Sequence, residues 1–219
     1  MQRNKQCIRM KGIITGDIIN STAIPIEHRR ELLSAIESIA KELQTLTPFK
    51  YEMFRGDSFQ IMVEKPEKAM CIAVLVKAGL KSRTPEECKI LWDARIAVGI
   101  GDVSYEDDKL VTSDGEAFHF SGREFDELGK RNLSIRTRWE DINDELNVST
   151  AFANDIIDNW TRNQAQIVYI SLTQNLTQKE IALKLGKTKQ NISKLFSSAK
   201  EALIRIYLKR IEHVINSKK

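Results

Sequence analysis

Apolar residues recur along the first part of the chain in two different periods, and their alternation predicts the fold. Near-continuous apolar runs are typical of buried strands, whereas apolar residues three and four positions apart are typical of helices. The expected elements are strands at 8–19, 49–54, 58–64 and 94–103 and helices at 26–46 and 67–82. The order strand, helix, strand, strand, helix, strand predicts a ferredoxin-like palm, and the chain is therefore assigned to the α+β class.

Three further elements are expected after the palm: a helix at 114–129, a strand at 133–139 and a helix at 141–159. We assign residues 1–140 to a palm domain, 141–160 to a helical connector and 161–219 to an all-α helix-turn-helix domain. The connector is not rich in Gly or Ser, so we expect it to couple the two parts rigidly.

The spacing of a small residue, a glycine and an apolar residue near the C-terminus predicts the helix-turn-helix. Ala182 allows two helices to cross closely, and Gly186 follows where the chain must turn through a left-handed conformation. Ile192 then closes the crossing from the second helix. Thr177 and Thr188 precede polar runs, as helix caps do. An ordinary helical hairpin in a bundle would show the same spacing, and this alternative stays open.

The outward side of the second helix carries side chains that suit double-stranded DNA. Such side chains hydrogen-bond base edges or phosphates in a major groove. The residues expected to do so are Thr188, Lys189, Gln190, Ser193 and Lys194. The helix after them has a candidate dimer seam at Leu203, Ile206, Leu208 and Ile211.

The charge balance changes between the two parts of the chain. Residues 161–219 hold 12 Lys and Arg against 3 Asp and Glu, whereas residues 1–160 hold 22 against 27. A basic region of this density fits a polyanionic partner, although a solubilising helical surface would have the same charge.

Cysteine usage and hydropathy limit the cellular compartments that suit this protein. The three cysteines, Cys7, Cys71 and Cys88, have no metal-ligand spacing, which is typical of a reduced protein with buried thiols. No apolar run reaches the length of a bilayer span, and no early segment has the pattern of a signal peptide. We expect a cytoplasmic protein with no membrane partner.

Two acidic residues in the palm are candidates for a metal site. Asp17 ends the first strand and Asp57 lies at the tip of a hairpin; in a palm the first and third strands are neighbours, so these carboxylates can meet. Mg²⁺ or Mn²⁺ would relieve their repulsion. Asn20, Ser21 and Thr22 follow at once and can present donors to the phosphates of a nucleotide. Aspartate after glycine also occurs in plain turns, which is the structural alternative.

Four segments resemble the catalytic domains of class III nucleotidyl cyclases. Residues 16–22 (Gly-Asp-Ile-Ile-Asn-Ser-Thr) are similar to their first metal-binding motif, and residues 55–59 (Arg-Gly-Asp-Ser-Phe) to their second metal-aspartate hairpin. Residues 94–103 resemble their central strand, and residues 115–123 are in register with the helix that carries a transition-state Asn and Arg. The resemblance covers roughly residues 8–130.

The resemblance implies a role for five residues. Asp17 and Asp57 match the two metal ligands, and Arg123 matches the arginine that stabilises charge on the transferred phosphoryl group. His119 stands where the cyclases have Asn, so its hydrogen-bonding geometry differs. Thr112 occupies a base-reading position. From the residues alone, Arg123 pairing with Glu127 and His119 on a helix surface remain open.

With the helix-turn-helix included, the whole chain resembles the SatD family of bacterial proteins, on residues 54–60 and 113–118. Three hypotheses follow. The first is a cytosolic DNA-binding regulator whose cyclase-like domain binds a metal–nucleotide ligand. The second is a Mg²⁺- or Mn²⁺-dependent nucleotidyl cyclase or related phosphoryl-transfer enzyme, and the third is a degenerate palm used only for dimerisation. Because cyclases of this type build their sites between two copies, the resemblance implies a homodimer.

Overall fold

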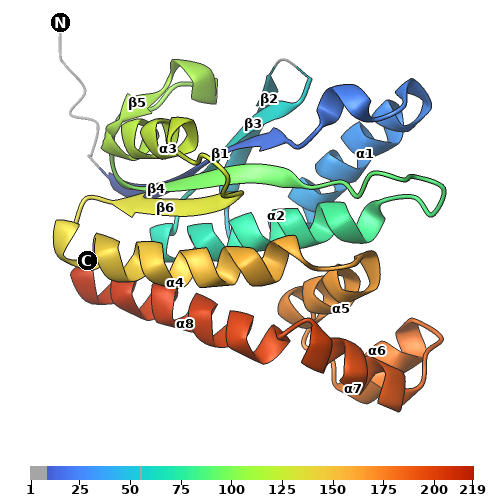
Figure 1. The fold of residues 1–219 in the computed structure, drawn as a ribbon. Coiled ribbons are helices and arrows are strands. Elements are labelled where there is room, and N and C mark those ends of the chain that lie inside the picture. The colour runs from blue at the N-terminus through green and yellow to red at the C-terminus, as the bar shows by residue number, and fades with distance from the viewer. Residues whose placement is uncertain (1–8, 55) are drawn as a thin grey trace, which may run out of the picture.

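The computed structural model describes residues 9–54 and 56–219, and its strands form one mixed sheet (Figure 1). The strands are β1 (Arg9–Ile18), β2 (Phe49–Phe54), β3 (Ser58–Val63), β4 (Ala94–Tyr105), β5 (Asp114–Gly115) and β6 (Leu133–Thr137). They follow the order β2-β3-β1-β4-β5, and β6 runs parallel to β4. The expected pairing of the first and third strands is present as an antiparallel ladder between β1 and β3. Arg55 of the hairpin motif and Cys7 lie outside the described residues.

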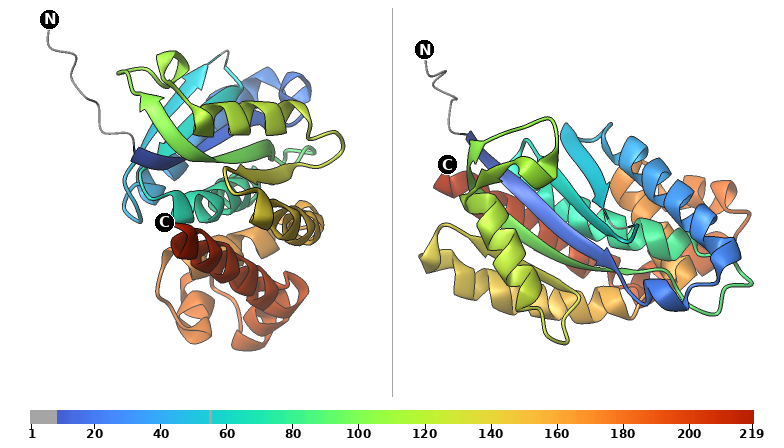
Figure 2. Two further views of the ribbon diagram at one scale, coloured as in Figure 1. Left: turned by 90° about the vertical axis from the view of Figure 1, so that its left-hand side faces the viewer. Right: turned by 90° about the horizontal axis from the view of Figure 1, so that it is seen from above.

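Helices cover both faces of this sheet. The helices of the first 160 residues are α1 (Ile26–Leu43), α2 (Ala69–Arg83), α3 (Glu116–Asp126) and α4 (Glu140–Asp158). Figures 1 and 2 show α3 alone on one face, with α2 and α4 on the other. Alternate residues of β1 serve the two layers: Ile14 and Ile18 join the large core, whereas Ile13 packs in a smaller cluster with Met62 and Ala117.

The α3 helix approaches the sheet closely because β4 has no side chain at the contact. A Cβ on Gly99 would lie 2.1 Å from the Ala117 carbonyl oxygen and 2.4 Å from the Ser121 amide nitrogen. The hydroxyl of Thr15 on β1 donates a 3.0 Å hydrogen bond to that of Ser121. These contacts fix α3 across β4 and β1.

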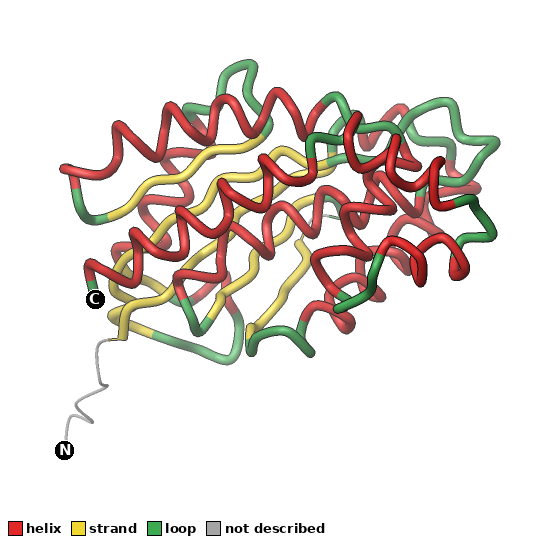
Figure 3. Tube along the Cα trace, turned by 90° about the horizontal axis from the view of Figure 1, so that it is seen from below, coloured by secondary structure: helices red, strands yellow, loops and turns green. Residues whose placement is uncertain are grey.

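The C-terminal helices pack beneath the α2 and α4 layer, as the view from below shows (Figure 3). They are α5 (Arg162–Thr173), α6 (Gln178–Lys184), α7 (Lys189–Ser198) and α8 (Glu201–Lys218). Their buried apolar side chains belong to the same continuous cluster as those beneath the sheet. The buried Tyr207 hydroxyl of α8 lies 2.8 Å from the Thr150 hydroxyl of α4. Residues 161–219 therefore share their core with the rest of the chain.

The structure corrects the dimer seam expected on α8. Leu208 and Ile211 are buried within the protein, whereas Leu203 and Ile206 are exposed. A helix that packs against α4 must turn one apolar stripe inward, and that stripe takes two of the four residues. Among the described helices, none combines the length and the hydropathy that crossing a membrane needs.

Candidate functional site

The two candidate metal ligands lie together at one end of the β1–β3 ladder. The Ser58 hydroxyl lies 3.1 Å from Oδ1 of Asp17 and 3.5 Å from Oδ1 of Asp57. The Ile18 amide donates a 3.0 Å hydrogen bond to the Asp57 carbonyl oxygen, which ties the hairpin to the end of β1. The Ser21 hydroxyl donates to Oδ2 of Asp57 at 2.8 Å. Two carboxylates from distant segments thus share one hydroxyl group.

The electrostatics of this pair favour a cation. Burial raises the pKa of the Asp17 carboxyl above its usual value, and the neighbouring Asp57 carboxylate raises it as well. The Ser58 hydroxyl and the Arg95 guanidinium act in the opposite direction but do not cancel the increase. The ionised form of Asp17 is therefore disfavoured in the protein alone, and a positive charge beside it would stabilise that form.

The donor set fits a hard divalent cation. In the described part of the chain, no three His, Cys, Asp or Glu side chains gather as ligands. Two carboxylates with hydroxyl groups beside them suit Mg²⁺ or Mn²⁺, because Mg²⁺ is often held by one or two carboxylates with water and substrate phosphates completing its shell. Zinc or iron would call for imidazole or thiolate ligands that this end of the sheet does not offer.

A hollow lies beside Asp57. It measures about 290 Å³ and is lined in part by Ser21, Thr22, Arg29 and Gly56. Ser21 and Thr22 belong to a 3-10 turn, η1 (Ser21–Ala23), that directly follows β1. Asn20 precedes this turn in a left-handed conformation with φ of 54°, which Asn tolerates better than most residues. Of the three predicted donors, Ser21 and Thr22 therefore line the hollow, whereas Asn20 precedes them in the chain and does not line it.

Two basic residues near the aspartates were absent from the sequence-based prediction. Arg29 lies in the first turn of α1 and lines the hollow beside Asp57. Arg95 is the cross-strand partner of Asp17, and its guanidinium stacks over the Phe125 ring at 5.1 Å from the ring centre. Arg29 carried no signal in the sequence, because it lies among other polar residues of α1. The cross-strand pairing of Arg95 follows from the β1–β4 register, which the sequence does not state.

The other predicted ligand-binding residues lie elsewhere in this chain. The Thr112 hydroxyl donates a 2.8 Å hydrogen bond to Asp107 within its own turn. His119 is exposed and its Nε2 lies 3.1 Å from Oδ1 of Asp114. Arg123 lines a separate hollow together with Arg136 of β6.

Arg123 and the aspartates are on opposite sides of the central strand. The strand β6, which carries Arg136, and the strand β1, which carries Asp17, flank β4 on opposite sides. Arg123 forms no ion pair with any described residue, including Glu127. The structure therefore brings Asp17, Asp57, Asn20, Ser21 and Thr22 together but leaves Thr112, His119 and Arg123 apart.

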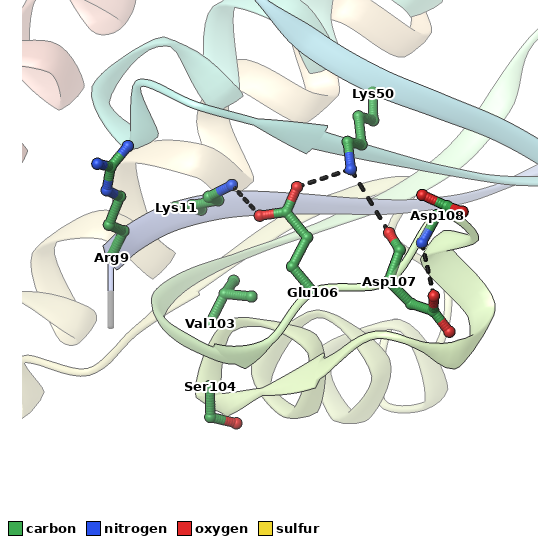
Figure 4. A pocket seen from close by; sticks show the side chains of 8 residues that line it. All are labelled: Arg9, Lys11, Lys50, Val103, Ser104, Glu106, Asp107 and Asp108. Atoms are coloured by element: carbon green, nitrogen blue, oxygen red, sulfur yellow. Dashed lines mark hydrogen bonds and ion pairs between the residues drawn. The ribbon is translucent and has the colours of Figure 1, made fainter. Parts of the chain in front are cut away.

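A larger charged hollow lies at the opposite end of β1, and Figure 4 shows its lining. It measures about 450 Å³ and includes Lys11, Lys50 and Glu106. The Lys11 ammonium lies 2.6 Å from Glu106 and 2.9 Å from Glu64, and Lys50 lies 2.7 Å from Glu106. Burial by itself lowers the pKa of Lys11, but the hydrogen bonds and charges of Glu106 and Glu64 together raise it above its usual value. Because its buried cation is already neutralised, this hollow is a poorer candidate for binding phosphate.

The segment predicted as a helix-turn-helix forms two short helices with a tight turn between them. Gly186 has φ of +61°, and the amides of Gly186 and Lys187 donate to the carbonyl oxygens of Leu183 and Ala182. This pair of hydrogen bonds is the Schellman motif, which terminates many helices. Ile192 is fully buried at the crossing, as expected.

The predicted DNA-binding residues lie along the start and the outer side of α7. Thr188 caps the helix, because its hydroxyl accepts a 3.2 Å hydrogen bond from the Asn191 amide. The other four, Lys189, Gln190, Ser193 and Lys194, are exposed. DNA binding by these residues stays a prediction.

Two solved structures are similar in fold to part of the chain. The structure of a bacterial light-regulated adenylyl cyclase has 16% sequence identity and a TM-score of 0.46, and the match covers 59% of this chain and 76% of that chain. The active GGEEF domain of a diguanylate cyclase from Vibrio cholerae has 13% identity and a TM-score of 0.39, with 60% and 85% covered. No curated protein matches the chain. The SatD family model matches residues 12–216, nearly the whole length, and the chain therefore belongs to the SatD family.

Proposed function

We propose that the protein binds a nucleoside triphosphate through a divalent cation held between Asp17 and Asp57. The observation that carries the proposal is the shared Ser58 hydroxyl, which brings two carboxylates from separate segments to one point. The raised pKa of Asp17 supports it, since an apposition of like charges is disfavoured unless a cation offsets it.

The surrounding residues suit the phosphate chain. Ser21 and Thr22 offer hydroxyl groups at the mouth of the hollow, and Arg29 offers a cation that can pair with phosphate oxygens. The bound cation would neutralise charge that develops on the phosphate being transferred. Ser58 and Ser21 orient the two carboxylates through their hydrogen bonds.

As the reaction at this site we propose nucleotidyl transfer of the cyclase type. The resemblance of residues 16–22 and 55–59 to the two metal motifs of class III cyclases supports it. The separation of Arg123 from the aspartates within one chain means that its implied role requires a second copy. Activity per molecule would then rise with protein concentration, whereas nucleotide binding to one copy would not.

The test is incubation with each of the four nucleoside triphosphates and Mg²⁺ or Mn²⁺, followed by chromatographic separation of the products. We expect a cyclic nucleotide and pyrophosphate from the wild type and neither from the double variant Asp17→Asn with Asp57→Asn. Asp108→Asn, an exposed acid in the loop after β4, is the matched control and should behave as the wild type.

A thermal-shift titration distinguishes catalysis from binding. A ligand that binds only the folded state raises the apparent stability by RT ln(1+[L]/Kd). A shift that depends on the cation and on both aspartates, without product, would leave a nucleotide-binding regulator. No shift and no product would overturn the proposal and leave the palm as a dimerisation module.

A second candidate function, DNA binding, is favoured by the α6–α7 geometry. A buried crossing at Ile192 leaves Lys189, Gln190 and Lys194 exposed on one helix. An exposed basic helix of this kind suits a major groove. Selection from genomic DNA fragments at low salt tests it, and recovery of no fragment above a protein-free control would reject it. If both functions hold, the protein is a nucleotide-responsive DNA-binding regulator.

A further inference from the structure

An apolar patch covers the outer side of the α4 and α8 pair. Ten large apolar side chains are exposed in the described chain, and four of them fall on these two helices. Phe152 is 73% exposed, Ile206 64%, Val148 60% and Leu203 53%. Isolated exposed apolar residues need no explanation, but a contiguous group on a monomer is typical of a docking surface.

These four residues are neighbours because α4 and α8 run side by side and antiparallel. The two helices lie next to each other in Figures 1 and 2. Their register is set by an ion pair between Glu145 and Arg210 and by the contact between Thr150 and Tyr207. This register places the turn of Phe152 level with the stretch from Leu203 to Ile206 (residues 203–206).

The two helices carry opposite charge. The α4 sequence has no Lys or Arg, and its exposed acids are Glu140, Asp141, Asp144, Glu145 and Asp155. On α8 the exposed charged groups are basic, namely Lys209 and Arg210, and His213 is exposed beside them. Glu140, Asp141 and Glu145 are ion-paired with Arg136, Lys218 and Arg210 of the same chain, so the charges that remain for a second copy are Asp144 and Asp155 on α4 and Lys209 on α8. The patch therefore lies between an acidic helix and a helix with a remaining cation, and this pattern is complementary to itself.

We propose that this α4–α8 surface is the interface of a homodimer. Two copies can meet face to face about a twofold axis that lies in the interface. An axis parallel to the helices sets α4 of one copy on α8 of the other, so that acid meets base and Phe152 packs on Leu203 and Ile206 of the second copy. An axis perpendicular to the helices would set the acidic α4 on itself, which like-charge repulsion disfavours. The charge pattern selects the first arrangement.

The size of the surface suits a specific contact. Helices of 19 and 18 residues are each roughly 28 Å long and about 10 Å wide, so the pair covers roughly 550 Å² before side-chain relief is counted. Specific interfaces bury about 800 Å² of accessible surface on each partner, and accessible area exceeds the flat footprint.

This arrangement has two consequences for the rest of the molecule. The α3 side of the sheet, which carries Arg123, remains free because α4 and α8 lie on the opposite side, so the second copy that the role of Arg123 requires is not the one bound at this surface. Since the axis runs along the helices, both copies of α7 lie at the same end of the dimer. Two recognition helices at one end are what a two-fold symmetric DNA site would require.

The test is sedimentation equilibrium of the full chain and of two variants, Phe152→Glu and Ile206→Glu. We expect a wild-type dimer, and in each variant a rise of at least about tenfold in the dissociation constant, because a carboxylate replaces buried apolar contact. Ile26→Glu is the matched control, since Ile26 on α1 is 80% exposed and lies outside the patch. Circular dichroism melts confirm that each variant is folded.

Disulfide trapping distinguishes the two twofold axes. Differently tagged Phe152→Cys and Ile206→Cys chains are mixed and oxidised, with Phe152→Cys alone as the comparison. A disulfide between a Phe152→Cys chain and an Ile206→Cys chain supports the proposal. A disulfide that forms mainly between two Phe152→Cys chains would overturn the arrangement. A wild-type monomer at tens of micromolar, or folded glutamate variants that remain dimers with wild-type affinity, would overturn the interface.

Discussion

Ser58 and Asp17 face each other across the β3–β1 ladder, and the Ser58 hydroxyl donates a 3.1 Å hydrogen bond to Oδ1 of Asp17. The bond holds in place a carboxylate that its environment otherwise disfavours, since burial and the Asp57 charge both raise the pKa of Asp17. Bringing the two carboxylates together in this way costs stability in the protein alone, and the proposed cation would offset that cost.

The raised pKa of Asp17 predicts the effect of Asp17→Asn on the stability of the protein. Because the folded-state pKa lies above the unfolded value of 3.8, the folded state binds the proton more tightly, and ionisation of Asp17 lowers stability as pH rises through that window. In chelator-treated buffer the variant should therefore be more stable than the wild type at pH 7. The difference should vanish below pH 3.8, where Asp17 is protonated in both states.

Thermal melts of both proteins between pH 3 and 8, with and without Mg²⁺, check this prediction. Addition of Mg²⁺ should raise the wild-type melting temperature and leave the variant unchanged, so that the neutral-pH difference narrows or reverses. A variant that is less stable at neutral pH without metal would contradict the account.

Gly99 and Gly122 form a second, opposed pair of predictions. A Cβ on Gly99 would meet backbone atoms of α3 at 2.1 and 2.4 Å, so Gly99→Ala must displace the helix. We expect it to destabilise the protein by about 1–3 kcal/mol. Gly122 lies within α3 and a Cβ there meets nothing within 4 Å. Gly122→Ala should therefore stabilise the protein by roughly 0.5–1 kcal/mol. Urea denaturation of both variants measures these changes, and similar effects at the two positions would refute the packing argument.

Lys77 forms a buried ion cluster, and its removal should be costly. Its ammonium lies 2.9 Å from Oδ1 of Asp93, 2.7 Å from the Ala94 carbonyl oxygen and 3.3 Å from Oδ1 of Asp158. Lys77→Met leaves buried carboxylate charge under-compensated, since only Lys81 remains beside Asp93. We expect a loss of about 3–5 kcal/mol in the free energy of unfolding.

The matched control for this variant is Lys41→Met on α1, an exposed lysine in the last turn of its helix. It should change the stability by less than about 0.5 kcal/mol, as surface substitutions generally do. A Lys77→Met protein as stable as this control would show that the cluster contributes nothing net.

The sequence predicted the order of the elements well and their contacts poorly, and the reason is physical. Apolar periodicity reports which face of an element is buried, and the ranges 26–46 and 94–103 correspond to α1 and β4. It does not report the partner. The ion pairs of Lys77 join residues 16 and 81 positions away, and no local pattern could announce them.

The residues of the candidate site also fall into two groups, those whose positions strand topology predicts and those whose positions depend on tertiary contacts. Asp17 and Asp57 could be brought together in advance, because strand adjacency in a palm is a topological rule. The position of Arg123 depends on which side of α3 faces β6, and that is a matter of helix rotation. Arg29 lies near Asp57 only because α1 begins beside the hairpin, which spacing along the chain does not reveal.

The final prediction concerns α7. Lys189 and Lys194 are exposed, and Ile192 between them is fully buried, so the helix is anchored by its core side and presents these cations outward. If they bind phosphates, affinity must weaken as salt rises, because each neutralised phosphate releases counterions from the duplex. Replacing both by Ala should lower affinity for a selected duplex and reduce the salt slope by about one unit for each phosphate that is no longer neutralised.

Fluorescence anisotropy of a labelled duplex, titrated at several salt concentrations, gives both quantities. Lys41→Ala combined with Lys89→Ala removes the same charge from exposed positions outside α7 and serves as the control. If net charge alone drives binding, the two double variants show equal reductions in affinity and slope. If α7 contacts the duplex, only the double variant Lys189→Ala with Lys194→Ala shows the reduction. An unchanged slope in that variant would show that the hairpin packs the protein and does not touch DNA.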